Sequence, residues 1–122
     1  MNQKTILLID DDSHILLAVK FHIPDIYKVQ TAKNGLEALY LLKYNRLPDL
    51  IISDINMPEM DGIQLLHCIS QNRILRKIPM IFISGESLSR KQIFELYKTG
   101  IKAIYQKPVN NIVIKNILNS YL

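Results

Sequence analysis

Residues 6–12 read Ile6-Leu7-Leu8-Ile9-Asp10-Asp11-Asp12, an apolar run that ends in three aspartates. A second apolar run, Leu50-Ile51-Ile52-Ser53-Asp54, ends in a single aspartate. Unbroken apolar runs of this length are typical of strands buried on both faces of a parallel sheet, and ligand sites form beyond the carboxyl ends of such strands. If the two strands are neighbours, several carboxylates meet in one small space. They then need a compensating cation, and a hard, oxygen-seeking ion such as Mg²⁺ is the natural one.

The rest of the chain alternates strand-like and helix-like segments, which predicts an α/β fold with helices on both faces of a parallel sheet. We expect strands at residues 5–10, 27–31, 50–54, 80–84 and 101–106. Polar and apolar residues alternate in the second strand, which indicates an edge position. We expect one helix between an N-cap at Ser13 and the break at Pro24, and others at residues 35–44, 63–72, 86–99 and 109–121. A flavodoxin-like, doubly wound five-stranded sheet of order 2-1-3-4-5 is favoured, since it puts the first and third strands side by side.

Composition indicates one compact domain and excludes several classes of function. The chain has 122 residues, 48% of them hydrophobic, and a single cysteine, Cys68, which we expect to be a small buried packing residue in a reducing compartment. No apolar stretch approaches the ~20 residues of a membrane helix, and residues 1–5 are not a signal peptide, so we expect a cytoplasmic protein without a membrane span. The net charge is +4, but the basic residues are scattered without interleaved aromatics. Direct nucleic-acid binding is therefore not expected.

The ends of four expected strands carry the groups that a phosphoryl-transfer site needs. The first strand ends in Asp10 and Asp11, the third in Asp54 and the fourth in Ser84, and the fifth runs into Lys107. In the favoured strand order, these ends face the same crevice. Carboxylates hold a metal ion that draws charge from phosphoryl oxygens, while a hydroxyl and an ammonium donate hydrogen bonds to other phosphoryl oxygens. An aspartate is an established phosphoryl acceptor.

The chain resembles a two-component response regulator receiver domain, and most simply the single-domain chemotaxis regulator of the CheY-like superfamily. The resemblance runs from about Lys4 to the C-terminus and depends on four motifs in order, namely residues 7–12, residues 49–62, residues 81–85 and Lys107-Pro108. It implies that residues 1–122 form one receiver domain. Asp54 would accept a phosphoryl group from a phosphohistidine on a sensor histidine kinase or a histidine phosphotransferase. Such a domain is a switch of partner binding, with no enzymatic activity beyond self-dephosphorylation.

The resemblance also implies a metal site around the acceptor. Asp11 and Asp54 would ligate Mg²⁺ directly, together with the backbone carbonyl of Asn56. Asp10 would act mostly through water, and Asp12 would at best support the site.

The resemblance implies further roles for residues at or just after the ends of the third, fourth and fifth strands. Ser84 stands where the family has its switch hydroxyl and Lys107 where it has its lysine, and the bond between Lys107 and Pro108 is expected to be cis. Asn56 and Glu86 lie two residues after the acceptor and two after the hydroxyl. An amide and a carboxylate there would orient an attacking water, so we predict a comparatively short-lived phosphoryl group.

Two positions depart from the family pattern. Ile104 stands where Tyr, Phe or His is usual, and Tyr105 cannot replace that ring because successive strand side chains face opposite ways. Val109 stands where Phe is common. Output is therefore expected through the loop after Ser84 and the fourth helix. Apolar residues cover more than one stripe of residues 109–121. Either they form a patch for homodimerisation or partner docking through the fourth helix, fifth strand and fifth helix, or the terminal helix is loosely patterned.

Other functions remain as alternatives. Asp10-Asp11-Asp12 also fits the Asp-x-Asp motif of haloacid-dehalogenase-like phosphatases, but those normally carry Thr or Val where this chain has His14. The chain is otherwise compatible with the receiver part of a larger DNA-binding or enzymatic regulator, or with a degenerate receiver that works without phosphate. The cognate kinase, the output and the oligomeric state do not follow from the sequence.

Overall fold

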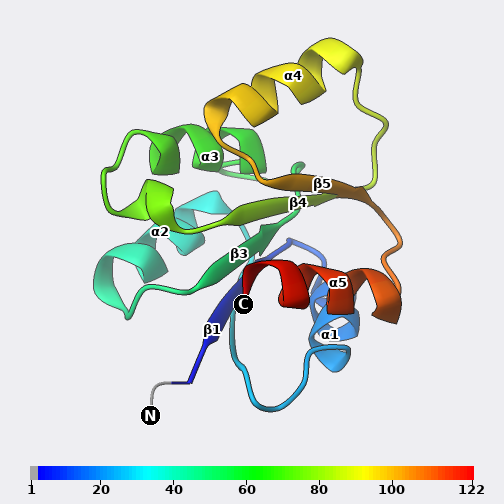
Figure 1. Cartoon of the computed structure of the whole chain (residues 1–122). Coiled ribbons are helices and arrows are strands. Elements are labelled where there is room, and N and C mark those ends of the chain that lie inside the picture. Colours follow the sequence, from blue (N-terminus) through cyan, green and yellow to red (C-terminus); the bar gives the residue numbers. More distant parts are fainter. Residues whose placement is uncertain (1–2) are drawn as a thin grey trace.

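A computed structural model describes residues 3–122, in which a five-stranded parallel sheet lies between two layers of helices (Figure 1). The strands are β1 (Thr5–Ile9), β2 (Lys28–Ala32), β3 (Leu50–Ser53), β4 (Met80–Ser84) and β5 (Ala103–Gln106). Their order is β2-β1-β3-β4-β5, and every neighbouring pair is parallel. The predicted winding is thus confirmed, with β2 at one edge.

The helices cover the two faces of the sheet unequally. The face with two helices carries α1 (Ser13–Phe21) and α5 (Asn111–Tyr121). The opposite face carries α2 (Gly35–Tyr44), α3 (Gly62–Ser70) and α4 (Arg90–Thr99) (Figure 1). A short 3₁₀ helix, η1 (Leu75–Lys77), precedes β4. Because every crossover between parallel strands is expected to be right-handed, the reversal of winding beside β1 places α1 and α2 on opposite faces.

Strand β1 shows why the central strands read as unbroken apolar runs. Leu7 and Ile9 pack into the core on the side of α2, α3 and α4, whereas Ile6 and Leu8 pack into the core on the side of α1 and α5. None of these four side chains is more than 2% exposed. Burying each one stabilises the fold by about 1.5–3 kcal/mol. The strand ends, and the residues that follow them, are thereby held in fixed positions.

Three predicted helix starts were wrong, and each error concerns the capping residue. Helix α5 begins at residue 111 rather than 109, because Asn110 caps it and accepts a hydrogen bond from the backbone N–H of Val113. Asp12, not Ser13, is the N-cap of α1, and its side chain accepts a hydrogen bond from the backbone N–H of His14. Helix α4 begins at residue 90 rather than 86, because Ser89 and Gln92 form a capping box there. Residues 86–89 therefore belong to a loop.

The expectation of a buried Cys68 was also wrong, since its side chain is exposed. The buried residues of α3 are Gly62, Leu65, Leu66 and Ile69. Their spacing of three and four residues defines one stripe along the helix, and position 68 lies outside it.

The apolar residues of the last helix do not form the broad exposed patch that was one of the two expectations. Ile114, Ile117 and Leu118 are buried against the sheet, and on α5 only Ile112 is a large apolar residue with high exposure, at 67%. Of the helices between residues 3 and 122, none has the length and apolar character to cross a lipid bilayer.

Candidate functional site

The register of the sheet brings the two acidic strand ends together. Ile9 pairs with Ser53 across β1 and β3, so Asp10 and Asp54 follow at adjacent positions. The backbone N–H of Asp54 donates to the carbonyl of Ile9 at 2.8 Å, which extends the pairing past the last strand residue. The two aspartates are only 4% and 8% exposed. Two nearly buried carboxylates thus lie side by side at the carboxyl edge of the sheet.

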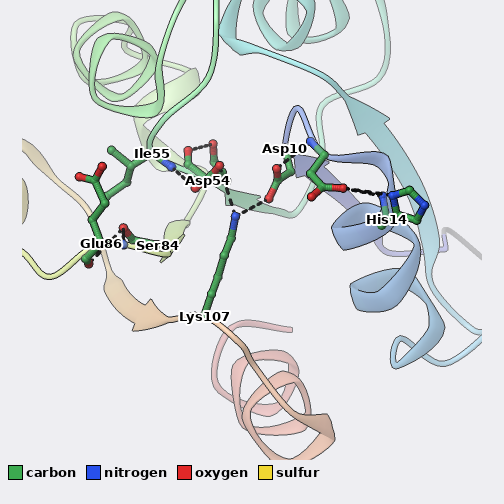
Figure 2. Close-up of polar contacts among 9 residues, drawn as sticks. Asp10, His14, Asp54, Ile55, Ser84, Glu86 and Lys107 are labelled. Atoms are coloured by element: carbon green, nitrogen blue, oxygen red, sulfur yellow. Dashed lines mark hydrogen bonds and ion pairs between the residues drawn. The ribbon is translucent and has the colours of Figure 1, made fainter.

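Lys107 reaches the same place from the end of β5. Its backbone N–H donates to the carbonyl of Ser84 at 2.8 Å, and a cis peptide bond joins it to Pro108, as predicted. Its ammonium lies between the two carboxylates, with Nζ 2.9 Å from Oδ2 of Asp10 and 3.3 Å from Oδ2 of Asp54 (Figure 2). The structure therefore brings Asp10, Asp54 and Lys107 into direct contact.

The charges of this group shift the titration of its members. Burial raises the pKa of Asp54 above its usual 3.8, and the neighbouring charge of Asp10 raises it further. The ammonium of Lys107 and the backbone N–H of Ile55 oppose this rise without cancelling it. For Lys107, burial favours the neutral form, but the hydrogen bond and charge of Asp10 and the charge of Asp54 outweigh it, so its pKa lies above 10.5. The ionised form of Asp54 is thus under electrostatic strain.

A third carboxylate completes an acidic cluster. Asp10, Asp11 and Asp54 each offer an oxygen, and these oxygens lie within 4.8 Å of one another. Asp11 is exposed, so the cluster opens to solvent on its side. Three carboxylates outnumber the one ammonium beside them, and a donor set of oxygens alone suits a hard divalent cation such as Mg²⁺. The residues present fit such an ion. Asn56 lies nearby in the chain, in the exposed loop after β3, and its carbonyl as a ligand stays a prediction.

Ser84 lies on the other side of Asp54 from Asp10, and its hydroxyl is engaged with the loop after β4 (Figure 2). The hydroxyl oxygen accepts a hydrogen bond from the backbone N–H of Glu86 at 3.1 Å and donates to the Glu86 carbonyl at 3.4 Å. Ser84 is 2% exposed, while Glu86 is exposed. The hydroxyl must turn away from residues 85–89 before it can donate to a group bound on Asp54.

Gly62, to which the sequence pattern assigns no role of its own, supports the backbone of Asp54. A Cβ atom at this position would lie 2.3 Å from the backbone oxygen of Asp54 and 2.9 Å from the ring of Phe82. The N–H of Gly62 also donates to the carbonyl of Ile55 at 2.7 Å. Asp61 itself is the N-cap of α3. The start of α3 therefore packs directly on the backbone of Asp54, a contact that only the tertiary structure reveals.

The side chains at 104 and 105 face opposite sides of β5, as expected from the alternation along a strand. Ile104 packs against the core on the side of α2–α4, while Tyr105 packs against the core on the side of α1 and α5. The position beside Ser84 at which the family usually has an aromatic ring therefore holds an aliphatic side chain.

Comparison with known proteins gives one consistent answer. A family model described as "Response regulator receiver domain" matches residues 6–119. Chemotaxis protein CheY-3 of Vibrio cholerae is 34% identical over 116 residues, which cover 93% of this chain and 88% of that protein. The probable transcriptional regulator ycf29 of Pyropia yezoensis is 34% identical over 124 residues, but this chain spans only 54% of its length. Among solved structures, the chemotaxis response regulator CheY4 of Vibrio cholerae superimposes with a TM-score of 0.85 at 29% identity, over 99% of this chain and 100% of that one.

Proposed function

Because the chain belongs to the response regulator receiver domain family, we propose that it is a phosphoacceptor switch of a two-component phosphorelay with Asp54 as the acceptor. The observation that carries this proposal is that Lys107 pairs with both Asp54 and Asp10, at the sheet edge where these two carboxylates and Asp11 form one cluster. In the reaction, a carboxylate oxygen of Asp54 forms a bond to phosphorus while the bond from phosphorus to a donor histidine nitrogen breaks. The bonding electron pair leaves with the imidazole.

The residues around Asp54 have two roles in this transfer, namely a hydrogen bond to the phosphoryl group and binding of a metal ion. Lys107 lies 3.3 Å from the acceptor, so its ammonium is within reach of an oxygen of a phosphoryl group on that carboxylate. We assign Asp10, Asp11 and Asp54, with the carbonyl of Asn56, as holders of Mg²⁺. When bound, this ion supplies electrostatic stabilisation of the charge on the transferring group.

Ser84 connects the phosphoryl group to the rest of the molecule. Its hydroxyl has one proton, which it now donates to the Glu86 carbonyl. A phosphoryl group on Asp54 offers a charged acceptor, and hydrogen bonds to charged groups are the stronger ones. Donation to that group releases the Glu86 carbonyl, and rotation of the hydroxyl away from the loop also weakens the bond from the Glu86 N–H, so we expect the loop of residues 85–89 to change its conformation. This loop leads directly into α4, where we place the output.

The exposed side chains of Asn56 and Glu86 support a short-lived phosphoryl group, because solvent water reaches both. We expect the double variant Asn56→Ala, Glu86→Ala to lengthen the lifetime of phospho-Asp54, measured by its decay in Mg²⁺ buffer after removal of the phosphodonor. Persistence of the wild-type phosphoryl group for many hours without a phosphatase would contradict this assignment.

We propose two kinds of partner. The donor is a sensor histidine kinase or a histidine phosphotransferase, and the downstream partner is a protein that binds the surface formed by α4, β5 and α5. Exposed basic side chains of this surface and the turn before β5 are Arg90, Lys91, Lys98, Lys102 and Lys115, and Glu95 is the single acidic residue between positions 87 and 122. A symmetric homodimer would bring like charges together, so an acidic partner is favoured over a second copy.

The experiment that tests the proposal is mass spectrometry after incubation with acetyl phosphate and Mg²⁺. The wild-type chain should gain one phosphoryl group, and Asp54→Asn should gain none. Asp61→Asn is the matched control, since asparagine also caps a helix and half-buried Asp61 lies outside the acidic cluster, so this variant should be modified like the wild type. Modification that persists in Asp54→Asn would refute the assignment, and steady turnover of p-nitrophenyl phosphate would favour the phosphatase alternative. We further propose that residues 1–122 are one receiver domain, acting alone or as the receiver of a longer regulator.

A further inference from the structure

A cavity of about 160 Å³ lies on the two-helix face of the sheet, and Asp10 and Asp54 of the acidic cluster form part of its border. Leu8, Ile52 and Ile83 form its wall on the sheet. Val19 of α1 closes one side, and Val109, in the loop that leads into α5, closes another. Figure 1 shows α1 and α5 together on this face. The cavity is therefore a half-open pocket between α1, the sheet and the loop before α5.

The chemistry of the walls disfavours water as the occupant. The sheet residues Leu8, Ile52 and Ile83 are at most 4% exposed, and their side chains are hydrocarbon. The polar side chains that border the cavity are Asp10 and Asp54, which both pair with Lys107, and Ser53, which donates to the carbonyl of Asp54; His22 adds its imidazole at the edge. Within residues 3–122, no buried side-chain nitrogen or oxygen lacks a hydrogen-bond partner. Water against the hydrocarbon wall therefore finds few free polar partners, and apolar cavities of ~150 Å³ in other proteins bind benzene or xenon.

We propose that this cavity is a binding site for a neutral, apolar molecule of about the size of benzene. Its volume sets the size of the ligand, and its hydrocarbon walls set the polarity. The carboxylates of Asp10 and Asp54 at its border repel an anion, and a cation is drawn instead into the acidic cluster. Entry is past Ala18, a small and exposed residue of α1 that also lines the cavity.

The site has a direct structural connection to the acceptor edge. Ser53, Asp54 and Lys107 all border the cavity, so an occupant lies against the strand end that carries the acceptor and against the lysine that pairs with it. Ala18 and Val109 also line the cavity, and a larger side chain at either position would fill part of its volume. The inference does not depend on the proposed function, because the ligand is held by core side chains of the unphosphorylated chain.

The test is a titration of the metal-free, unphosphorylated chain with benzene, followed by NMR of isotope-labelled methyl groups. Saturable chemical-shift changes are expected at the methyls of Leu8, Ile52, Ile83 and Val109. Those of Leu96, buried on the opposite face, should not move. Val109→Phe should place a ring in the cavity and abolish the saturable changes.

Ile112→Phe is the matched control, since it adds the same ring three residues later, at a position where the side chain is 67% exposed. This variant should bind benzene like the wild type. If Val109→Phe does not fold, a second test uses the wild-type protein alone. Its crystals under xenon pressure should show a xenon atom between α1 and the sheet. Shifts that do not saturate, equal binding by folded Val109→Phe, or no xenon at this place would overturn the proposal. None of these measurements uses a phosphodonor, so failure of phosphorylation and failure of ligand binding are separate results.

Discussion

Replacing Lys107 with methionine removes the ammonium that lies between two nearly buried carboxylates while keeping an unbranched side chain. At an effective dielectric constant of about 20, separations of 2.9 and 3.3 Å correspond to gross attractions of roughly 6 and 5 kcal/mol. The cost of burying the charges offsets much of this, and breaking a buried pair from one side costs about 3–5 kcal/mol. Because the lysine side chain is still 19% exposed, the lower end applies. We therefore expect Lys107→Met to lose about 3 kcal/mol of stability near neutral pH.

The assay is urea and thermal unfolding followed by circular dichroism, once in EDTA and once in MgCl₂. In EDTA the variant should melt roughly 10 °C below the wild type. Added MgCl₂ should stabilise the variant more than the wild type, because a divalent cation takes over neutralisation of Asp10 and Asp54. Lys115→Met, which removes an exposed lysine from α5, is the control and should stay within ~0.5 kcal/mol of the wild type. A Lys107→Met variant that unfolds at the wild-type midpoint in EDTA would refute the reasoning.

The remaining predictions concern the acceptor and its support. Burial and the charge of Asp10 raise the pKa of Asp54 on folding, so in EDTA its contribution to stability is complete below pH 3.8 and is lost as the pH rises through the raised pKa. Urea midpoints across this range should show the decline, and Asp54→Asn should flatten it and be the more stable protein at neutral pH. Gly62→Ala should cost about 1–3 kcal/mol and slow modification by acetyl phosphate, because its Cβ would lie 2.3 Å from the Asp54 carbonyl oxygen. Gly85→Ala is the control, because its Cβ would meet only the Lys107 side chain at 3.9 Å, so it should unfold at the wild-type urea midpoint. Equal urea midpoints for Gly62→Ala and Gly85→Ala would contradict the steric argument.

The strand order and the acidic site were predictable because they depend on patterns that few folds satisfy. Central strands such as β1 must be apolar on both faces, so their ends are visible in the sequence as the first charged residue. The carboxyl ends of parallel strands meet at one edge, so Asp10, Asp54 and Lys107 follow from the winding alone. The start of α4 was missed because periodicity extended the helix back to Glu86, although Ser89 and Gln92 carried a capping-box signal.

Other features depend on tertiary contacts that no local pattern encodes. The closeness of Gly62 to the acceptor backbone is a distance between two elements, and nothing in the residues around Gly62 sets it apart from an ordinary glycine after an N-cap. The cavity beside α1 likewise arises from the combined volumes of side chains on three strands, a helix and a loop. Such volumes are decided by packing, which tolerates many sequences of the same apolar pattern.

The charge balance of the site makes its occupation and the stability of the fold interdependent. Burial of the apolar strands brings Asp10 and Asp54 together against their mutual repulsion. Burial raises the pKa of Asp54 most, the charge of Asp10 raises it further, and Lys107 only partly opposes both effects. Anything that neutralises the acidic cluster in the folded state and not in the unfolded state therefore stabilises the fold by linkage. A cation does this at the carboxylates, whereas a phosphoryl group on Asp54 adds negative charge that only Lys107, Ser84 and a bound cation can offset. If Asp54 accepts a phosphoryl group as proposed, the Ser84 hydroxyl, which now bonds to Glu86, is the group through which that added charge would reach the β4–α4 loop.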